Sequence, residues 1–145
     1  MLTNDFQIPA KDKKLTLTYE KPTEAIFVLA DPDRLREVLM NLISNAIKFT
    51  SQGSITIKNR NMNSWAVTDI KDTGVGIKKE DQGKMFEIFT KTNLSLMGQE
   101  KGTGLGLSIS EEIVNKYGGK IRVETVPGEG SVFTVSLPEK YLENV

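Results

Sequence analysis

The sequence of 145 residues lacks two reactive residue types entirely, since it contains no cysteine and no histidine. The absence of cysteine excludes disulfide bonds and thiolate metal sites, and it is compatible with a reducing compartment. The absence of histidine excludes imidazole acid–base catalysis, histidine metal ligands and a phosphorylated histidine within this chain. Both absences narrow the classes of chemistry that are open to the chain.

The sequence also lacks an excess of charge and a long apolar run. Lysine and arginine together number 19, and so do aspartate and glutamate, so no net charge attracts the chain to nucleic acid or anionic lipid. The basic run at Lys11, Lys13 and Lys14 is interpreted as solvated surface. No apolar segment approaches the roughly 18 residues of a membrane span, and the first residues do not resemble a signal peptide. We therefore expect a cytoplasmic domain that contacts neither nucleic acid nor membrane, and membrane anchoring of a longer parent protein stays open.

Length and composition predict one globular domain over residues 1–145. Strands are predicted where apolar and polar residues alternate or where a hairpin closes, at residues 15–19, 54–58, 65–71, 120–126 and 131–137. The short apolar run at 26–29 predicts a further buried strand. Residues 59–64 predict a polar hairpin turn, and residues 139–145 a frayed C-terminal tail.

Two long helices are expected between these strands. Asp31 as N-cap and Pro32 in the first turn begin the first helix, which ends near Lys48. The second is predicted over residues 104–117 and ends at a pair of glycines; its inward side chains are expected to be Leu107, Ile109, Ile113, Val114 and Tyr117. A short helix is predicted over 78–87 and a mobile loop over 90–101. Because hairpins join several strands, the elements predict an α+β fold, in which a mixed, mainly antiparallel sheet is covered by helices on one face.

One face of the first long helix is polar. Its residues Glu37, Asn41, Asn45 and Lys48 fall within an arc of about 80°, opposite an apolar stripe that is expected to face the core. Most polar stripes are solvated surface and nothing more. Two amides four residues apart, followed by a lysine, can also hold Mg²⁺ together with phosphate and water. On this helix alone, both interpretations stay open.

Two glycine clusters, residues 72–76 (DTGVG) and 102–106 (GTGLG), are the most informative feature of the chain. Glycines at alternate positions allow tight turns that bring backbone N–H groups against an anionic ligand. Asp72 follows a predicted strand and could accept a hydrogen bond from an exocyclic amine while the glycines admit a flat base; the alternative is an ordinary Asp–Gly turn. The second cluster precedes a helix, whose N-terminus suits phosphate, and it is neither a Walker loop nor a Rossmann fingerprint. Together with the polar helix, the clusters favour a nucleotide site.

Joined in this order, four segments closely resemble the catalytic, ATP-binding domain of sensor histidine kinases, within the superfamily of gyrase, heat-shock chaperone and mismatch-repair ATPases. The segments are DPDRLREVLMNLISNAIKFT, DTGVGI, MFEIF and GTGLGLSIS, followed by YGGKIRVETVPGEGSVFTVSLP. They cover about residues 30–138, and all four boxes at these spacings are very specific. The resemblance implies a two-layer α/β sandwich of the Bergerat fold with a lid loop over ATP.

The resemblance also implies a role for each matching residue. Asn45 is the expected Mg²⁺ ligand beside Asn41, Lys48 faces phosphate, and Asp72 hydrogen-bonds the adenine amino group. The glycines of the second cluster frame the phosphates beneath the lid at about 90–101. The remaining nucleotide-binding residues are expected to be Gly74, Gly76, Ile77, Phe89, Gly102, Thr103, Gly104, Leu105 and Gly106.

Catalytic roles are expected for Glu37, Asn41, Lys48 and Lys91. Glu37 occupies the position of an acid that activates water in the superfamily's hydrolases, and its role in kinases is open. Lys91 stands where the family usually has arginine, so the charge is kept and the guanidinium fork is lost. The family's full N-terminal helix is expected to be reduced to a truncated segment over about residues 1–14, which contain Pro9.

The implied reaction is transfer of the γ-phosphoryl group of ATP to a histidine in two-component signal transduction. Because this chain has no histidine, the acceptor must lie on a separate, upstream dimerisation and phosphotransfer domain. A response regulator is the expected downstream partner, and the isolated domain is expected to be a monomer. Two alternatives stay open, an ATP-gated clamp ATPase and a protein-serine kinase of the same superfamily.

Overall fold

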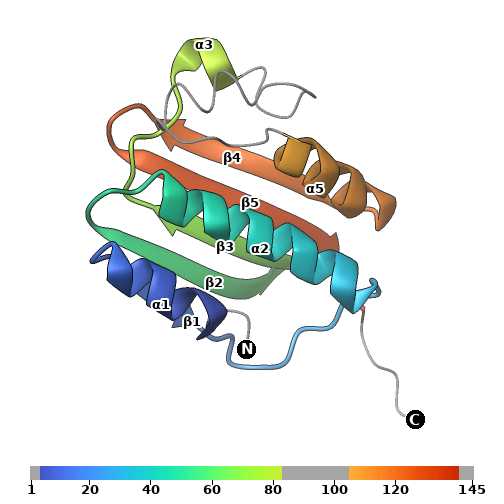
Figure 1. Ribbon diagram of the computed structural model, residues 1–145. Helices are drawn as coiled ribbons and strands as arrows, with labels where there is room; N and C mark the ends of the chain where they lie inside the picture. The colour runs from blue at the N-terminus through green and yellow to red at the C-terminus, as the bar shows by residue number, and fades with distance from the viewer. Residues whose placement is uncertain (1–3, 83–104, 141–145) are drawn as a thin grey trace.

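The computed structural model describes residues 4–82 and 105–140, and its centre is a five-stranded sheet. The strands lie in the order β1-β2-β3-β5-β4 (Figure 1). Strand β1 pairs with β2 in parallel, and the other three neighbouring pairs are antiparallel. The strand bounds are Thr16–Glu20 for β1, Ser54–Met62 for β2, Trp65–Asp72 for β3, Lys120–Val126 for β4 and Gly130–Pro138 for β5.

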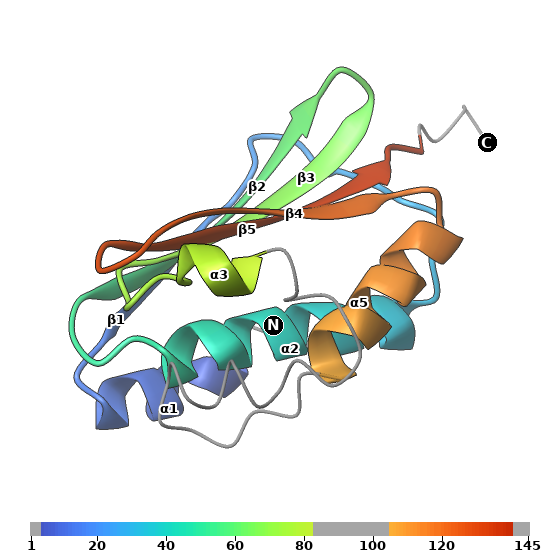
Figure 2. The ribbon, with the colours of Figure 1, turned by 90° about the horizontal axis from the view of Figure 1, so that it is seen from above.

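Helices form a second layer on one face of this sheet. Figure 2 shows α1 (Asn4–Asp12), α2 (Pro32–Lys48) and α5 (Leu105–Lys116) on the same side of the strands. The core between the layers takes its fully buried side chains from α2, β2, β3 and α5, among them Val38, Leu42, Ile55, Ile70 and Val114. The predicted α+β architecture is confirmed. Within the described residues, no helix is both long and apolar enough to cross a membrane.

Helix α2 begins and ends as its sequence signals predict. The Asp31 side chain accepts a hydrogen bond of 2.9 Å from the backbone N–H of Asp33, and Pro32 is the first helical residue. At the other end, the Nζ of Lys13 donates to the carbonyl oxygens of Ile47 and Lys48 at 2.7 and 3.1 Å. Lys13 was expected on a solvated surface; instead it ties the end of α1 to the last carbonyls of α2.

Helix α5 ends in a Schellman motif at the predicted glycines. Gly118 adopts a φ of +81°, its N–H bonds the carbonyl of Asn115, and the N–H of Gly119 bonds the carbonyl of Val114, both at 3.0 Å. One predicted inward residue is wrong, because Ile109 is 43% exposed. It follows the buried Leu107 by two positions, which turns its side chain by about 200° around the helix.

The predicted buried strand at residues 26–29 is also wrong. The segment forms a single bridge, between Val28 and Glu139, and its run of apolar residues is not buried as a whole. Phe27 is 45% exposed and Leu29 is 77% exposed, while Ile26 and Val28 are half-buried. This continuous apolar run therefore forms a connection between β1 and α2 in which only one side is partly buried. It is not a strand that is covered on both faces.

The predicted turn at residues 59–64 proves to be mostly strand. Strand β2 continues to Met62, and the turn consists of Asn63 and Ser64, both at positive φ. The polar side chains are satisfied across the hairpin: Thr68 donates to Asn59 at 2.8 Å, and Arg60 pairs with Asp69 at 2.8 Å. Cross-strand polar pairs of this kind stabilise a strand that composition alone suggests is a loop.

Two further predictions concern the chain ends and the short helix. Helix α1 spans nine residues in spite of Pro9, and Ala10 is fully buried against the core. The predicted helix at 78–87 is present as α3, Lys79–Gln82; Lys78 lies just before it, and residues 83–87 lie outside the described part, as does most of the tail at 139–145.

Candidate functional site

The polar stripe of α2 lies partly buried beside α5. Asn41, Asn45 and Lys48 are half-buried, and the Nδ2 of Asn41 donates to the Ser110 hydroxyl of α5 at 3.2 Å. Asn41 therefore borders a second element, and the stripe around it is not a fully solvated face. Glu37, one turn earlier, is exposed and pairs with Arg34 at 3.1 Å. It is therefore the least enclosed of the four predicted residues on this helix.

Asp72 lies at the end of β3 with its carboxylate buried, at 7% exposure. Its Oδ1 accepts a 2.9 Å hydrogen bond from the N–H of Gly74, and Ser131 on β5 opposes Asp72 in the strand register. Burial raises the pKa of Asp72, and the backbone N–H groups of Gly74 and Ser131 oppose that shift. A carboxylate has about four acceptor positions, so it retains capacity for a ligand donor.

The glycines after Asp72 allow the loop to approach other backbone segments closely. A Cβ on Gly74 would lie 2.4 Å from the carbonyl oxygen of Phe49, and one on Gly76 would lie 2.3 Å from that of Val126. Gly76 also has a φ of +68°. The first of these contacts brings Asp72 to the C-terminal end of α2, where the N–H of Val75 bonds Phe49. An ordinary Asp–Gly turn does not require two glycines that each lie this close to the backbone of another segment.

Ile77 differs from the other predicted ligand residues because it belongs to the hydrophobic core. Its side chain is buried, and its N–H donates to the Thr125 hydroxyl of β4 at 2.8 Å. The same hydroxyl lies 2.8 Å from that of Ser131. The backbone of the loop after β3 is thus hydrogen-bonded to a side chain of β4, and that side chain contacts one of β5.

The second glycine cluster is described only at its end. Leu105 and Gly106 form the first residues of α5, so a helix does follow the cluster as predicted. Phe89, Lys91, Gly102, Thr103 and Gly104, together with the predicted lid at 90–101, lie outside the described residues. The described half of the site therefore comprises the α2 stripe, Asp72 and the loop that follows it.

Sequence reasoning missed three hydroxyl residues around Asp72 and the loop that follows it. Thr50 directly follows the C-cap of α2, Ser131 opposes Asp72 in the strand register, and Thr125 contacts Ser131. Thr50 and Ser131 are both buried. The periodicity of a sequence does not distinguish a buried hydroxyl residue from an exposed one. Of the three, only Ser131 carried a local sequence signal, because it follows a turn glycine.

The donor types limit what metal this site could hold. The residues that the structure describes include no group of three or more histidines, cysteines, aspartates or glutamates. Such a site does not suit an ion bound by protein alone. Amide oxygens of half-buried Asn41 and Asn45 do fit Mg²⁺, which keeps several waters and binds through one or two protein oxygens plus substrate phosphates.

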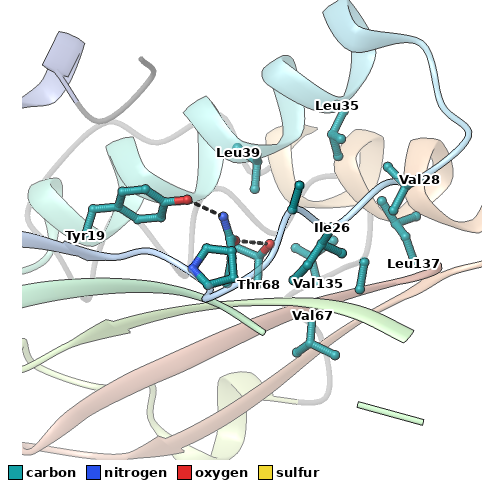
Figure 3. Close-up of a pocket in the computed structure, with 13 residues that line it drawn as sticks. Tyr19, Ile26, Val28, Leu35, Leu39, Val67, Thr68, Val135 and Leu137 are labelled. Carbon is teal, nitrogen blue, oxygen red and sulfur yellow. Dashed lines mark hydrogen bonds between the residues drawn. The ribbon is translucent and has the colours of Figure 1, made fainter. Parts of the chain in front are cut away.

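A different hollow, of about 350 Å³, lies on the other side of α2 and shares no residue with the predicted site. Figure 3 shows Leu35 and Leu39 of α2 on one side of it, with Val135 and Leu137 of the sheet opposite. A short hydrogen-bond chain runs from Thr68 through Asn59 to the Tyr19 hydroxyl. The walls of this hollow are mainly apolar. The hollow is therefore interpreted as a gap beneath the 26–29 connection and not as a phosphate site.

Comparison with known proteins identifies the family. The model of the histidine kinase-, DNA gyrase B-, and HSP90-like ATPases matches residues 30–141. The chain belongs to this family. The circadian input-output histidine kinase CikA of Synechococcus elongatus is 42% identical over 114 residues, which are 78% of this chain and 15% of CikA. The signal transduction histidine-protein kinase BarA of Escherichia coli is 40% identical over 128 residues, 84% of this chain and 14% of BarA.

Solved structures of histidine kinases agree with this membership. The nucleotide-free catalytic domain of histidine kinase ThkA matches with a TM-score of 0.80 at 29% identity, over 95% of this chain and 89% of that one. Full-length ShkA in complex with AMPPNP matches with a TM-score of 0.85 at 26% identity, over 99% of this chain and 29% of ShkA. The chain is therefore an ATP-binding catalytic domain of the histidine kinase type, and it spans only a small part of its curated relatives.

Proposed function

We propose that the domain binds Mg²⁺-ATP and transfers its γ-phosphoryl group to a histidine on a separate dimerisation and phosphotransfer domain. The observation that carries this proposal is the buried Asp72 carboxylate, with spare acceptor capacity, next to the end of the helix that bears Asn41, Asn45 and Lys48. A single ATP molecule could bind to both, with its purine amine at the Asp72 carboxylate and its phosphates along the α2 stripe.

Each described residue has a distinct task in this proposal. Asp72 accepts a hydrogen bond from the adenine amino group, while Gly74 and Gly76 keep the loop close to the end of α2. Lys48 would neutralise phosphate charge, and Asn45, with Asn41 beside it, would hold Mg²⁺, which would add further positive charge to stabilise the phosphates. Asn41 is oriented by its hydrogen bond to Ser110. The lid, Phe89, Lys91 and the second glycine cluster complete the proposed site.

The reaction requires a nucleophile that this chain cannot supply, because it has no histidine. An imidazole nitrogen of the acceptor attacks the γ-phosphorus, the bond to the β–γ bridging oxygen breaks, ADP leaves with that electron pair, and the imidazole N–H proton passes to solvent. Such transfers depend mainly on positioning and charge neutralisation. Relatives support the partners: ThkA has been solved in complex with the response regulator TrrA.

The proposal predicts that the chain alone binds Mg²⁺-ATP without becoming phosphorylated. The test incubates it with γ-labelled ATP, with and without a fragment that carries the acceptor histidine of a related sensor kinase. Acid-labile label is expected on the fragment alone. Label on the isolated chain, or acid-stable label on serine of the added protein, would contradict histidine transfer, and rapid ATP hydrolysis that depends on Glu37 would favour the clamp ATPase.

A further inference from the structure

We propose that Ser110 of α5 sets how tightly the site binds Mg²⁺, because its hydroxyl fixes which end of the Asn41 side-chain amide faces the ligand. The inference rests on the proposed function, since it assumes that the α2 stripe holds Mg²⁺ together with the phosphates of ATP. Ser110 is a positioning residue in this account, because it acts through Asn41 and touches neither the metal nor the reacting atoms.

The contact joins two helices that are far apart in the sequence. Asn41 on α2 donates from Nδ2 to the Oγ of Ser110 on α5 at 3.2 Å, across 69 residues of chain. Ser110 is only 2% exposed, whereas Asn41 is half-buried. A buried position inside a helix favours alanine, which forms helix better than serine and has no hydroxyl to satisfy. The bond to Asn41 therefore gives a reason for serine at this position, and packing does not.

This hydrogen bond determines how the amide is turned. The two ends of an asparagine amide are nearly the same size, so packing alone does not choose between them. Only the carbonyl oxygen can bind a cation, because the –NH₂ end carries two donors. A serine inside a helix can donate its own proton to the carbonyl one turn earlier, which leaves its oxygen as an acceptor for Nδ2. With Nδ2 bonded to Ser110, Oδ1 is the end that stays available to a ligand.

The carbonyl end of the Asn41 amide is accessible. Within the part of the chain that the structure describes, no group donates to Asn41 Oδ1. In the same part, the one fully enclosed side-chain nitrogen or oxygen that lacks a partner is Oγ1 of Thr50. Asn41 Oδ1 is therefore not enclosed by protein, and a ligand can reach it. Asn45, one turn further along α2 and also half-buried, carries a second amide on the same side of the helix.

A group that holds a metal ligand in place contributes to metal affinity without touching the metal. Loss of such a partner typically weakens metal binding by about 10- to 100-fold, because the ligand is then no longer held in the binding orientation. Ser110 lies on the helix that follows the second glycine cluster. Through Ser110, the position of α5 thus affects an amide of α2, and the two helices act on Mg²⁺ affinity together.

Calorimetry with ATP, once in excess Mg²⁺ and once in EDTA, separates this role from a general effect on the fold. Ser110→Ala removes the acceptor, and we expect it to bind ATP about tenfold more weakly in Mg²⁺ but with wild-type affinity in EDTA. Ser110→Thr keeps the hydroxyl and should keep the wild-type affinity in both buffers, even if its extra methyl group lowers the melting temperature. Ser110→Cys, whose sulfur is a weak acceptor, replaces Ser110→Ala if that variant does not fold.

Two further measurements test whether the effect passes through Asn41. In an Asn41→Ala background, Ser110→Ala should cause no additional loss of Mg²⁺-ATP affinity, because the two residues act as one unit. In the chain without nucleotide or metal, NMR can follow the side-chain amide protons of Asn41, which are identified by their loss in Asn41→Ala. These protons should exchange with water faster in Ser110→Ala than in the wild type, and Ser110→Thr should resemble the wild type.

An unchanged Mg²⁺-ATP affinity of Ser110→Ala would overturn the inference. Equal losses in Mg²⁺ and in EDTA would also overturn it, since a purely structural role of Ser110 predicts that result. A further loss of affinity in the Asn41→Ala background would contradict the route through Asn41. A wild-type chain that does not bind Mg²⁺-ATP would instead overturn the proposed function, and the inference with it.

Discussion

At the scale of single residues, Asp72 carries two opposing requirements. In the proposed function, recognition of an adenine amine needs its carboxylate as an acceptor, but burial at the end of β3 disfavours the charge and raises its pKa. The backbone N–H groups of Gly74 and Ser131 oppose that shift. The carboxylate is therefore held by fixed donors whose positions depend on the loop glycines and on the pairing of β3 with β5.

This balance predicts that the affinity for Mg²⁺-ATP depends on pH through the titration of Asp72. Because an anionic carboxylate is the better acceptor, wild-type affinity for Mg²⁺-ATP should fall as the pH drops through the raised pKa. Asp72→Asn should bind at least tenfold more weakly at neutral pH, because it loses a charged hydrogen bond. Calorimetry from pH 7 down to about pH 4 checks this, with Asp72→Asn reporting the titration of ATP itself. Parallel profiles for the two proteins would contradict the assignment.

The raised pKa of Asp72 also makes the free energy of unfolding depend on pH. The sign of this dependence is opposite to that for a salt-bridged carboxylate, whose pKa is lowered. A raised folded-state pKa means that the folded chain binds the Asp72 proton more tightly than the unfolded chain. The resulting stabilisation is complete below the unfolded pKa and is lost as pH rises through the folded pKa. The free energy of unfolding of the wild type, relative to Asp72→Asn, should accordingly fall over that interval.

At the scale of elements, α2 joins the core to the site. Its apolar side buries Val38, Leu42 and Ile43, while its polar side carries Asn45 and Asn41, which bonds Ser110 of α5. Both ends are fixed, by Asp31 at the start and by Lys13 at the end. Fixed ends set the rotation of the helix, and thereby the place of each amide.

The contact of Lys13 predicts a measurable cost. Lys13→Met keeps the aliphatic length but removes two hydrogen bonds to the last carbonyls of α2, so we expect a loss of about 1 kcal/mol in the free energy of unfolding. Lys11→Met is the matched control, since Lys11 is exposed and belongs to the same basic run. Chemical denaturation of both variants decides the point. Equal stability of the two would show that Lys13 is solvated surface after all.

Local signals predicted the elements whose ends are determined locally. The cap at Asp31 and the glycines after α5 depend on neighbouring residues, and both predictions are confirmed. Residues 26–29 and 59–64 were predicted wrongly because their state depends on pairing partners outside each segment, namely Glu139 and the strand that carries Asp69. Asp72 and Asn41 could be proposed as site residues from motifs, whereas Thr50 acquires its place only where α2 meets the loop at Gly74.

At the scale of the whole molecule, the two layers leave the second face of the sheet uncovered by any described element. That face carries Thr56, Lys58 and Lys71, which alternate with the buried Ile55, Ile57 and Ile70. The candidate site lies at the end where α2, the loop after β3 and the turn between β4 and β5 meet. The domain thus concentrates its candidate ligand-directed groups at one end, and in the proposed function the acceptor histidine would approach that end from another domain.

The central claim is that one pocket at Asp72 holds the base of ATP while the α2 stripe holds its phosphates. A crystal structure of the chain with a non-hydrolysable ATP analogue and Mg²⁺ tests it most directly. We expect the adenine amino group within hydrogen-bond distance of the Asp72 carboxylate and the phosphates beside Asn45 and Lys48. A base bound in the apolar hollow beneath residues 26–29, or phosphates distant from α2, would contradict the account.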